Sequence, residues 1–431
     1  MAKEEIPDRK FVSLIELQRE NGCEYLKTET YTHHDSVKAM QRASADTVRE
    51  EISQKISDSP FVGILVDETV NVTVHKKLIM FLKIVDDGKP RTIFIGNYTV
   101  LNGTAQTVAD KILSVIGDHG IEISKVMGLG SDGAPVMTGR HNSVGVRLKH
   151  QNVYLIRVHC ATHRLALAAA DASRGVKKVT EYKKTVNNIF NFFKYSATRY
   201  HRLRELNKIL ESEGVLSLKE PCSVRWLSFG RAVKIFYDNW PAIFMEFDEE
   251  AAQRDNAVAG GLLKQIKQYS FLAITHLLMD VLPIMDRCNL VLEREDVNLV
   301  TIKPMVQSTI ASLQLLLESD SLGEHESKLT REIKNNVYCG LSLTFAAANH
   351  IEGYANVRCD FITYLIERLR ARFPSECTDL LTCLDASKYP DRDVEIRDYG
   401  TESLATLIAN FGANRVEDGV PMVAPIHGPD L

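Results

Sequence analysis

Residues 57–71 of the chain read SDSPFVGILVDETVN. An apolar, β-branched run from Phe61 to Val66 stops at Asp67, and a second carboxylate, Glu68, follows directly. A short apolar run bounded by Ser, Pro and Asp is typical of a buried β-strand. Consecutive strand residues point to opposite faces, so Asp67 is a candidate site residue and Glu68 is a bystander. The alternative is that Asp67 only opens the turn toward Val70 and Asn71.

The segments around this strand predict an α/β unit. Two more strands follow, KLIMFLKIVDD (77–87) and RTIFIGNYTV (91–100), with DDGK (86–89) as a hairpin turn between them. A helix over 103–120 begins at the cap Thr104 and stops at Gly120. The strands KVMGLGSD (125–132) and VYLIRVH (153–159) come next, each followed by a helix. This order, β-β-β-α-β-α-β-α over 61–175, is the wiring of a ribonuclease-H-like fold.

Length and composition restrict the class of protein. A chain of 431 residues with 45% hydrophobic and 25% charged residues predicts two or three soluble domains. The sequence contains no uncharged apolar run of about 18 residues, and its start does not resemble a secretory signal. Its eight cysteines form no C-x-x-C pair, which indicates reduced thiols rather than a disulfide framework. We therefore expect an intracellular protein without a membrane partner.

Charge is distributed unevenly along the chain. Residues 140–234 contain 19 Lys and Arg but 6 Asp and Glu, a net charge of +13, whereas the rest of the chain has a net charge of −17. A basic block of this size favours a polyanionic partner such as DNA, although solvated basic helices are also common. The basic pairs Lys177-Lys178 and Lys183-Lys184 lie within it and are compatible with nuclear import.

The sequence after about residue 175 predicts helices almost throughout. Apolar residues recur at three- and four-residue spacing in six segments, 181–212, 226–254, 262–296, 299–319, 326–352 and 356–373. Pro283 is expected to kink the third of them. The predicted division is a helical leading arm (1–58), a ribonuclease-H-like core (59–175), a large helical domain (176–410) and a disordered Gly/Pro-rich tail (411–431).

Asp132, in GLGSDGAPVMTG (128–139), is the second candidate carboxylate. Glycines on both sides of it let the backbone bend tightly, although glycine clusters also make plain turns. The predicted fold places Asp67 and Asp132 at the ends of neighbouring strands. Two hard oxygen donors at close range suit Mg²⁺ or Mn²⁺.

Two further motifs lie between the sheet and the helical domain. Cys160 and His163 form a Cys-x-x-His pair, but no second half with suitable spacing follows, so we expect no structural zinc site. Arg225 and Trp226, in SVRWLS, place a guanidinium beside an indole within the basic block. Trp226 either packs in the core or stacks on an unpaired base.

Four of these motifs together resemble the hAT-superfamily DNA transposases, in particular transposon-derived proteins found fused to zinc fingers. The motifs are ILVDET (64–69), GLGSDGAPVMTG (128–139), HCATHRLAL (159–167) and SVRWLS (223–228), and the resemblance spans roughly residues 10–410. It implies a ribonuclease-H-like core interrupted by a helical insertion. It also implies that Asp67 and Asp132 are the first two acidic residues of a catalytic triad. By the same resemblance Cys160 and His163 are the family's C-x-x-H pair, and Trp226 supports a flipped base during hairpin formation.

The chain departs from this family in its third acidic residue. The family has a glutamate after the insertion, in a motif resembling S-E-R-x-F-S within a C-terminal dimerisation region, and no such motif occurs in this sequence. Glu402 is the one carboxylate near the expected place, and its surroundings do not match. The family's N-terminal zinc finger is not recognisable either. We therefore expect a transposase-derived pseudoenzyme whose remaining competence is weakly sequence-selective DNA binding.

Two other functions remain open from the sequence. The helical domain could be a protein-interaction module, with the sheet as its scaffold. Alternatively, the chain could be a divergent Mg²⁺-dependent nuclease or transposase that takes its third carboxylate from Glu402 or another residue. The sequence does not indicate an oligomeric state.

Overall fold

The computed structural model describes residues 7–23, 25, 31–70, 76–209, 226–294, 297, 299–318, 322–344, 350–374, 399–403 and 405. The chain forms two compact units, Met1–Arg157 and Val158–Leu431. Each unit has a hydrophobic core of its own. The sequence predicted a boundary at residue 175, and that boundary stays a prediction. α6 (Ala161–Gly175) packs along α14 (His350–Arg372), a helix far away in the sequence.

A five-stranded mixed sheet forms the centre of the first unit. Its strands are β1 (Val62–Val70), β2 (Lys76–Asp86), β3 (Lys89–Thr99), β4 (Val126–Ser131) and β5 (Ile156–His159), in the spatial order β3-β2-β1-β4-β5. β1 pairs with β2 antiparallel and with β4 parallel. The predicted fold class is therefore confirmed, a mixed α/β core combined with a helical region.

Local sequence explains these elements. Asp87 and Gly88 have φ angles of 50° and 72°, which the two-residue turn between β2 and β3 requires and which Gly and Asp tolerate. The hydroxyl of Thr104 accepts a hydrogen bond from the backbone N–H of Thr107 (3.3 Å) and so caps α3 (Ala105–Asp118) as predicted. Ser143 caps α5 (Val144–Gln151) in the same way.

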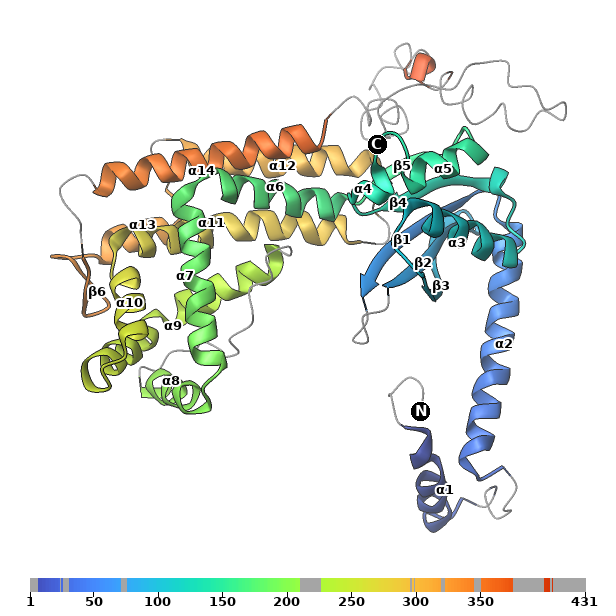
Figure 1. Ribbon diagram of the computed structural model, residues 1–431, viewed down its shortest axis with the longest axis horizontal. Helices are drawn as coiled ribbons and strands as arrows, with labels where there is room; N and C mark the ends of the chain where they lie inside the picture. Colours follow the sequence, from blue (N-terminus) through green and yellow to red (C-terminus); the bar gives the residue numbers. More distant parts are fainter. Residues whose placement is uncertain are drawn as a thin grey trace. The chain divides into compact units, whose positions relative to one another are not determined.

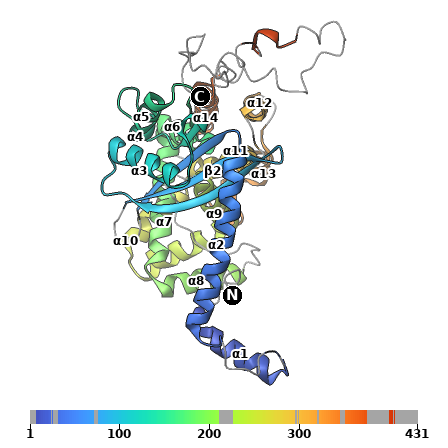
Figure 2. The ribbon, with the colours of Figure 1, turned by 90° about the vertical axis from the view of Figure 1, so that its right-hand side faces the viewer.

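One face of the sheet is covered by α3 and α5 (Figure 2). The apolar residues of this face, Val62, Ile64 and Val66 on β1 among them, are buried in the core of the unit. The alternate residues of β1, Gly63, Leu65 and Asp67, point to the other face. That second face is more open, since the side chain of Phe94 on β3 is 56% exposed.

A helical arm precedes the sheet. It consists of η2 (Asp8–Lys10), α1 (Phe11–Glu20) and α2 (His34–Asp58), and α2 runs out from the sheet with α1 beside its far end (Figure 1). Val37 and Ile56, near its two ends, are the residues of α2 that are buried. Lys55 anchors the arm through an ion pair with Asp86 on β2 (3.3 Å).

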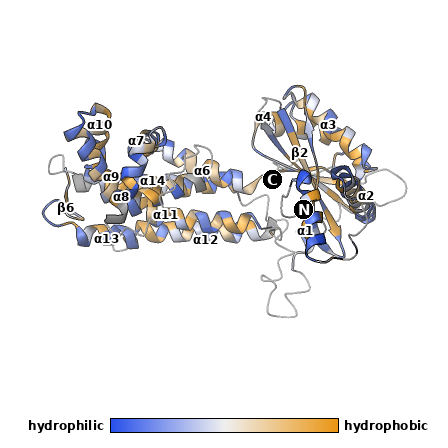
Figure 3. Ribbon diagram, turned by 90° about the horizontal axis from the view of Figure 1, so that it is seen from below, coloured by the Kyte–Doolittle hydropathy of each residue, from blue (hydrophilic) through white to orange (hydrophobic). Residues whose placement is uncertain are grey.

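The second unit is almost entirely helical. After α6 come α7 (Lys177–Lys194), α8 (Ala197–Ile209), α9 (Trp226–Gln253), α10 (Ala257–Ile266), α11 (Tyr269–Leu292), α12 (Leu299–Leu317), α13 (Glu324–Glu332) and α14. Figure 3 shows hydrophobic residues along α11 and α12. α11 is buried on several sides, and it continues as one helix past Pro283.

Two segments of this unit differ from the predicted helices. The segment predicted as 181–212 divides into α7 and α8 around Tyr195. The segment predicted as 326–352 leaves the helix after Glu332 and forms a hairpin of β6 (Val337–Tyr338) and β7 (Leu341–Ser342). Cys339 and Gly340, with φ angles of 49° and 75°, make the turn of that hairpin.

Two short helices, η4 (Ile123–Lys125) and α4 (Pro135–Thr138), flank β4. None of the helices in the described ranges combines the length and apolar character that a membrane span requires. The predicted tail from 411 lies outside the described residues.

Candidate functional site

The two predicted carboxylates belong to neighbouring strands of the sheet. Leu65 of β1 pairs with Gly130 of β4, and the two strands run in the same direction. Asp67 lies two residues after Leu65 within β1, and Asp132 follows the last residue of β4. The two residues therefore lie toward the same end of adjacent parallel strands, as the sequence predicted, and their role as a joint metal site stays a prediction.

Local contacts hold the two carboxylates differently. Asp67 is exposed near the end of β1, where its backbone pairs with Ile79 of β2. Asp132 is half-buried, and its Oδ1 accepts a hydrogen bond from the backbone N–H of Ala134 (3.2 Å). Asp132 therefore also stabilises the turn into α4, and its second oxygen remains for another ligand.

Glu68 lies on the opposite face from Asp67, with the buried residues Val66 and Ile64. Its Oε1 is buried and has no hydrogen-bond partner. Glu68 thus takes no part in the pair formed by Asp67 and Asp132.

The pair suits a magnesium-type ion. Mg²⁺ is commonly held by one or two carboxylates together with water and substrate phosphates, so two aspartates at an open strand end fit Mg²⁺ or Mn²⁺. Glu402, the candidate for a third acidic ligand, is exposed and belongs to the helical unit. Its role with Asp67 and Asp132 stays a prediction.

The Cys-x-x-His pair lies at the start of α6. Cys160 is the exposed N-cap residue of this helix, and its Sγ is 3.0 Å from the hydroxyl of Thr162. The ring of His163 contacts that of His159, with centroids 5.4 Å apart. These contacts give Cys160 and His163 local packing roles at the end of β5.

The lysines of α7 divide into surface and packing residues. Lys177, Lys178 and Lys184 are exposed, and the first two reach the carboxylate of Glu181 at 4.0 and 3.4 Å. Lys183 instead places its ammonium over the ring of Phe229, 4.8 Å from the centroid. Burial, with a contribution from the charge of Arg174, lowers the pKa of Lys183.

Position along α7 explains why neighbouring lysines differ. Lys183 borders the buried stripe of Val179, Tyr182 and Val186, whereas Lys184 lies one position further round, seven residues after Lys177. A long side chain beside an apolar stripe commonly packs its stem on it. The helical periodicity of the sequence therefore distinguishes Lys183 from Lys184.

Part of the basic block is structural. Arg202 binds both Glu246 and Glu250, and Arg199 binds Glu250 at 3.3 Å. The two glutamates lie on α9 and are almost fully buried, so these ion pairs join α8 to α9. Their arginines are committed inside the unit, and the exposed charge of the block is smaller than the sequence count.

Two predicted nucleic-acid contacts can be described only in part. Trp226 is the first residue of α9, and its side chain lies outside the described residues. Arg225 lies outside them entirely. Their predicted roles stay predictions.

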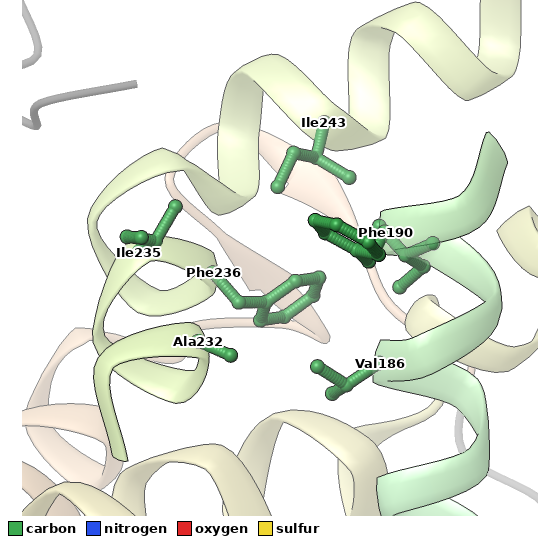
Figure 4. A pocket seen from close by; sticks show the side chains of 7 residues that line it. Val186, Phe190, Ala232, Ile235, Phe236 and Ile243 are labelled. Carbon is green, nitrogen blue, oxygen red and sulfur yellow. The ribbon is translucent and has the colours of Figure 1, made fainter. Parts of the chain in front are cut away.

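The helical unit also contains a small apolar hollow between α7 and α9 (Figure 4). Val186 and Phe190 of α7 face Ala232, Phe236 and Ile243 of α9 across it. Its volume of about 20 Å³ is close to that of a single water site. No titratable side chain lines the hollow, so it suits an apolar side chain rather than catalysis.

Comparison with known families agrees with this description of the first unit. Residues 16–143 match the DUF4371 family, described as the ZMYM1/FAM200, RNase-like domain. The match runs from α1 through the arm, the first four strands and α4. It therefore includes both Asp67 and Asp132, and this part of the chain is similar to an RNase-like domain.

Proposed function

We propose that this protein is transposase-derived and binds DNA, and that Asp67 and Asp132 are the remaining part of a divalent-metal site. The observation that supports the proposal is the parallel pairing of β1 with β4 in an RNase-like sheet, because Asp67 and Asp132 come at the carboxyl ends of these two neighbouring strands. The order of motifs in the sequence and the exposed lysines of α7 support it further.

The exposed lysines of α7 supply the proposed contact with phosphates. Lys177 and Lys184 are seven residues apart and share one face of the helix, with Lys178 beside them. Glu181 partly neutralises the first turn, so the surface binds a polyanion weakly. Phosphate contacts carry no sequence information, which accounts for weak sequence selectivity.

The test is the affinity for a short fluorescent duplex, measured by anisotropy with the full chain. We expect the triple substitution Lys177→Gln, Lys178→Gln and Lys184→Gln to weaken binding about tenfold or more at low salt, because three phosphate contacts are lost. The matched control replaces the exposed lysines Lys89, Lys264 and Lys334 by glutamine. Equal loss of affinity in both triple variants would overturn the α7 surface as the binding site.

We further propose that the site no longer cleaves DNA. Two protein carboxylates bind one ion loosely, whereas clamping the attacking and leaving oxygens of an in-line displacement requires a fuller ligand set. Incubation of the full chain with a transposon-end-like oligonucleotide and Mn²⁺ should leave the strands intact. Metal-dependent nicking that disappears in Asp67→Asn would show an active nuclease instead.

The second candidate is a protein-interaction module, and the apolar hollow between α7 and α9 is the observation that favours it. An interaction role predicts that Ile235→Ala, which removes a partly exposed apolar side chain from the lining of the hollow, weakens capture of partners while DNA affinity is unchanged. The DNA-binding proposal predicts the reverse: affinity for DNA falls when the α7 lysines are substituted and does not change in Ile235→Ala.

A further inference from the structure

A cluster of three metal-ligating side chains lies at the start of α2. His33 is the N-cap residue of the helix, and His34 and Asp35 are its first two residues. The nitrogen and oxygen donors of the three side chains all lie within 4.8 Å of one another. Among the residues that the structure describes, this is the one such cluster of three or more His, Cys, Asp and Glu side chains.

The spacing of the donor atoms fits a small tetrahedral ion. Nδ1 of His33 is 3.2 Å from Oδ2 of Asp35, and Nε2 of His34 is 3.3 Å from Oδ1 of the same carboxylate. Ligand atoms bound at 2.0–2.1 Å around a tetrahedral Zn²⁺ lie about 3.3 Å apart. Each imidazole nitrogen is therefore one ligand–ligand distance from an oxygen of Asp35, and the two distances end on different oxygens of that carboxylate.

The same side chains also cap the helix. Nδ1 of His33 accepts a hydrogen bond from the backbone N–H of Asp35 (3.4 Å), and the centroids of the two imidazole rings are 4.0 Å apart. A metal ion on this nitrogen replaces the capping hydrogen bond, and the positive end of the 25-residue helix opposes any cation. The expected metal affinity is therefore lower than that of a buried zinc site.

We propose that His33, His34 and Asp35 bind a divalent first-row transition metal ion of the Zn²⁺ type. Two imidazoles and one carboxylate are donors that Zn²⁺, Ni²⁺ and Cu²⁺ bind more tightly than Mg²⁺ does. All three side chains are substantially exposed, by 64%, 44% and 69%, so the remaining coordination positions are open to water or to a ligand from a partner. The inference is independent of the proposed DNA binding, since neither the carboxylate pair nor the lysines of α7 take part.

Lys38 provides an internal check on this site. Its ammonium lies 3.7 Å from Oδ1 of Asp35, one turn along the helix. The ammonium competes with a metal ion for that oxygen and adds repulsion. Removing the charge in Lys38→Met should therefore raise the metal affinity of the cluster, whereas it should leave binding at any distant site unchanged.

The test is titration of the full chain with Co²⁺, followed by its visible d–d absorption, and with Zn²⁺ in competition. We expect one equivalent of tetrahedral Co²⁺ without a thiolate charge-transfer band, which excludes binding by the free cysteines. Each of His33→Gln, His34→Gln and Asp35→Asn should weaken binding about tenfold or more, because even outer-shell changes cost that much. Circular dichroism confirms that each variant is folded.

The control is His150→Gln, which removes an exposed histidine at the end of α5. It should leave Co²⁺ affinity unchanged. A d–d spectrum that persists in the His33 and His34 variants, or is lost equally in the His150 variant, would overturn the proposal. Absence of any saturable binding in the wild-type chain would overturn it as well.

Discussion

His276 of α11 is fully buried, and both of its ring nitrogens are hydrogen-bonded. Its Nδ1–H donates to the carbonyl oxygen of Leu272 (2.9 Å), and its Nε2 accepts from the hydroxyl of Tyr338 (3.2 Å). Burial, with smaller effects from the nearby charges of His325 and Lys328, lowers the pKa of His276 to about 4. This neutral ring joins α11 to the β6–β7 hairpin, so the hairpin depends on its protonation state.

The lowered pKa of His276 predicts a loss of stability in mild acid. Between its folded pKa of about 4 and the ordinary value of 6.5, the unfolded chain binds the proton more tightly, so stability falls as the pH falls. We expect about 2 kcal/mol less stability at about pH 5 than at pH 7 from this group alone. Urea unfolding of the wild type and of His276→Gln at both pH values measures the difference.

Asp286 changes the folding stability with pH in the opposite direction to His276. The wild type must therefore be compared with a variant. Burial, opposed by the charge of Arg231, raises the pKa of Asp286 to about 6. Its contribution to stability therefore grows as the pH falls, and it cancels when wild type and His276→Gln are subtracted. A difference between the two proteins that does not change with pH would contradict the role assigned to His276.

Among the elements of the second unit, a buried ion pair joins neighbouring helices to one another. Glu326 of α13 and Arg358 of α14 are buried, at 4% and 7% exposure, and Nε of Arg358 donates to both carboxylate oxygens at 3.2 and 3.1 Å. Tyr354 of α14 also donates to Glu326, and Arg358 donates to the carbonyl oxygen of Leu316 on α12. One guanidinium therefore links three helices.

Arg358→Leu should destabilise this unit severely. The substitution leaves the carboxylate of Glu326 buried without its counter-ion, which costs about 3–5 kcal/mol. The double variant Glu326→Gln with Arg358→Leu should recover part of that loss, because no buried charge remains unpaired. The measurement is the urea midpoint of the helical circular dichroism signal. Equal midpoints for the single and double variants would show that lost packing, and not the unpaired charge, dominates.

The elements differ in how far their sequence predicts them. The strands and turns of the first unit were predictable because alternation, the Asp87-Gly88 turn and the Thr104 cap are local signals. The β6–β7 hairpin was missed because its apolar residues repeat at helical spacing, while the deciding feature is a run of left-handed residues that includes Asn335 and Asn336. The α6–α14 contact joins segments about 190 residues apart, and no local pattern reports it.

The candidate sites show the same division between local and tertiary information. Asp67 and Asp132 were candidates because each ends an apolar run of sequence, and the predicted neighbouring strands are indeed paired as β1 and β4, while the metal site itself stays a prediction. The structural role of Arg199 and Arg202 could not be predicted from the sequence. Their partners Glu246 and Glu250 lie more than 40 residues away. His33, His34 and Asp35 are consecutive in the sequence and are all of metal-ligating type, but they were not among the predicted site residues.

At the scale of the whole molecule, the chain combines an RNase-like unit with a helical unit that contains exposed basic residues. The net charge of −4 for the whole chain does not show that basic residues are concentrated in residues 140–234. Arg199 and Arg202 serve as internal ion-pair partners, whereas Lys177, Lys178 and Lys184 of α7 are exposed. The proposed DNA binding is therefore expected to be of modest strength and governed by ionic strength.

The dependence of DNA affinity on salt concentration decides whether this protein binds DNA through its exposed lysines. Release of counterions from about three phosphate contacts predicts a slope near −3 in a plot of log K against log salt concentration, for the full chain with any duplex sequence. The triple α7 variant should lose most of that slope, and the control triple variant should keep it. Affinity that is absent, or constant from about 50 to 300 mM salt, would contradict the assignment of this protein as a DNA-binding relative of transposases.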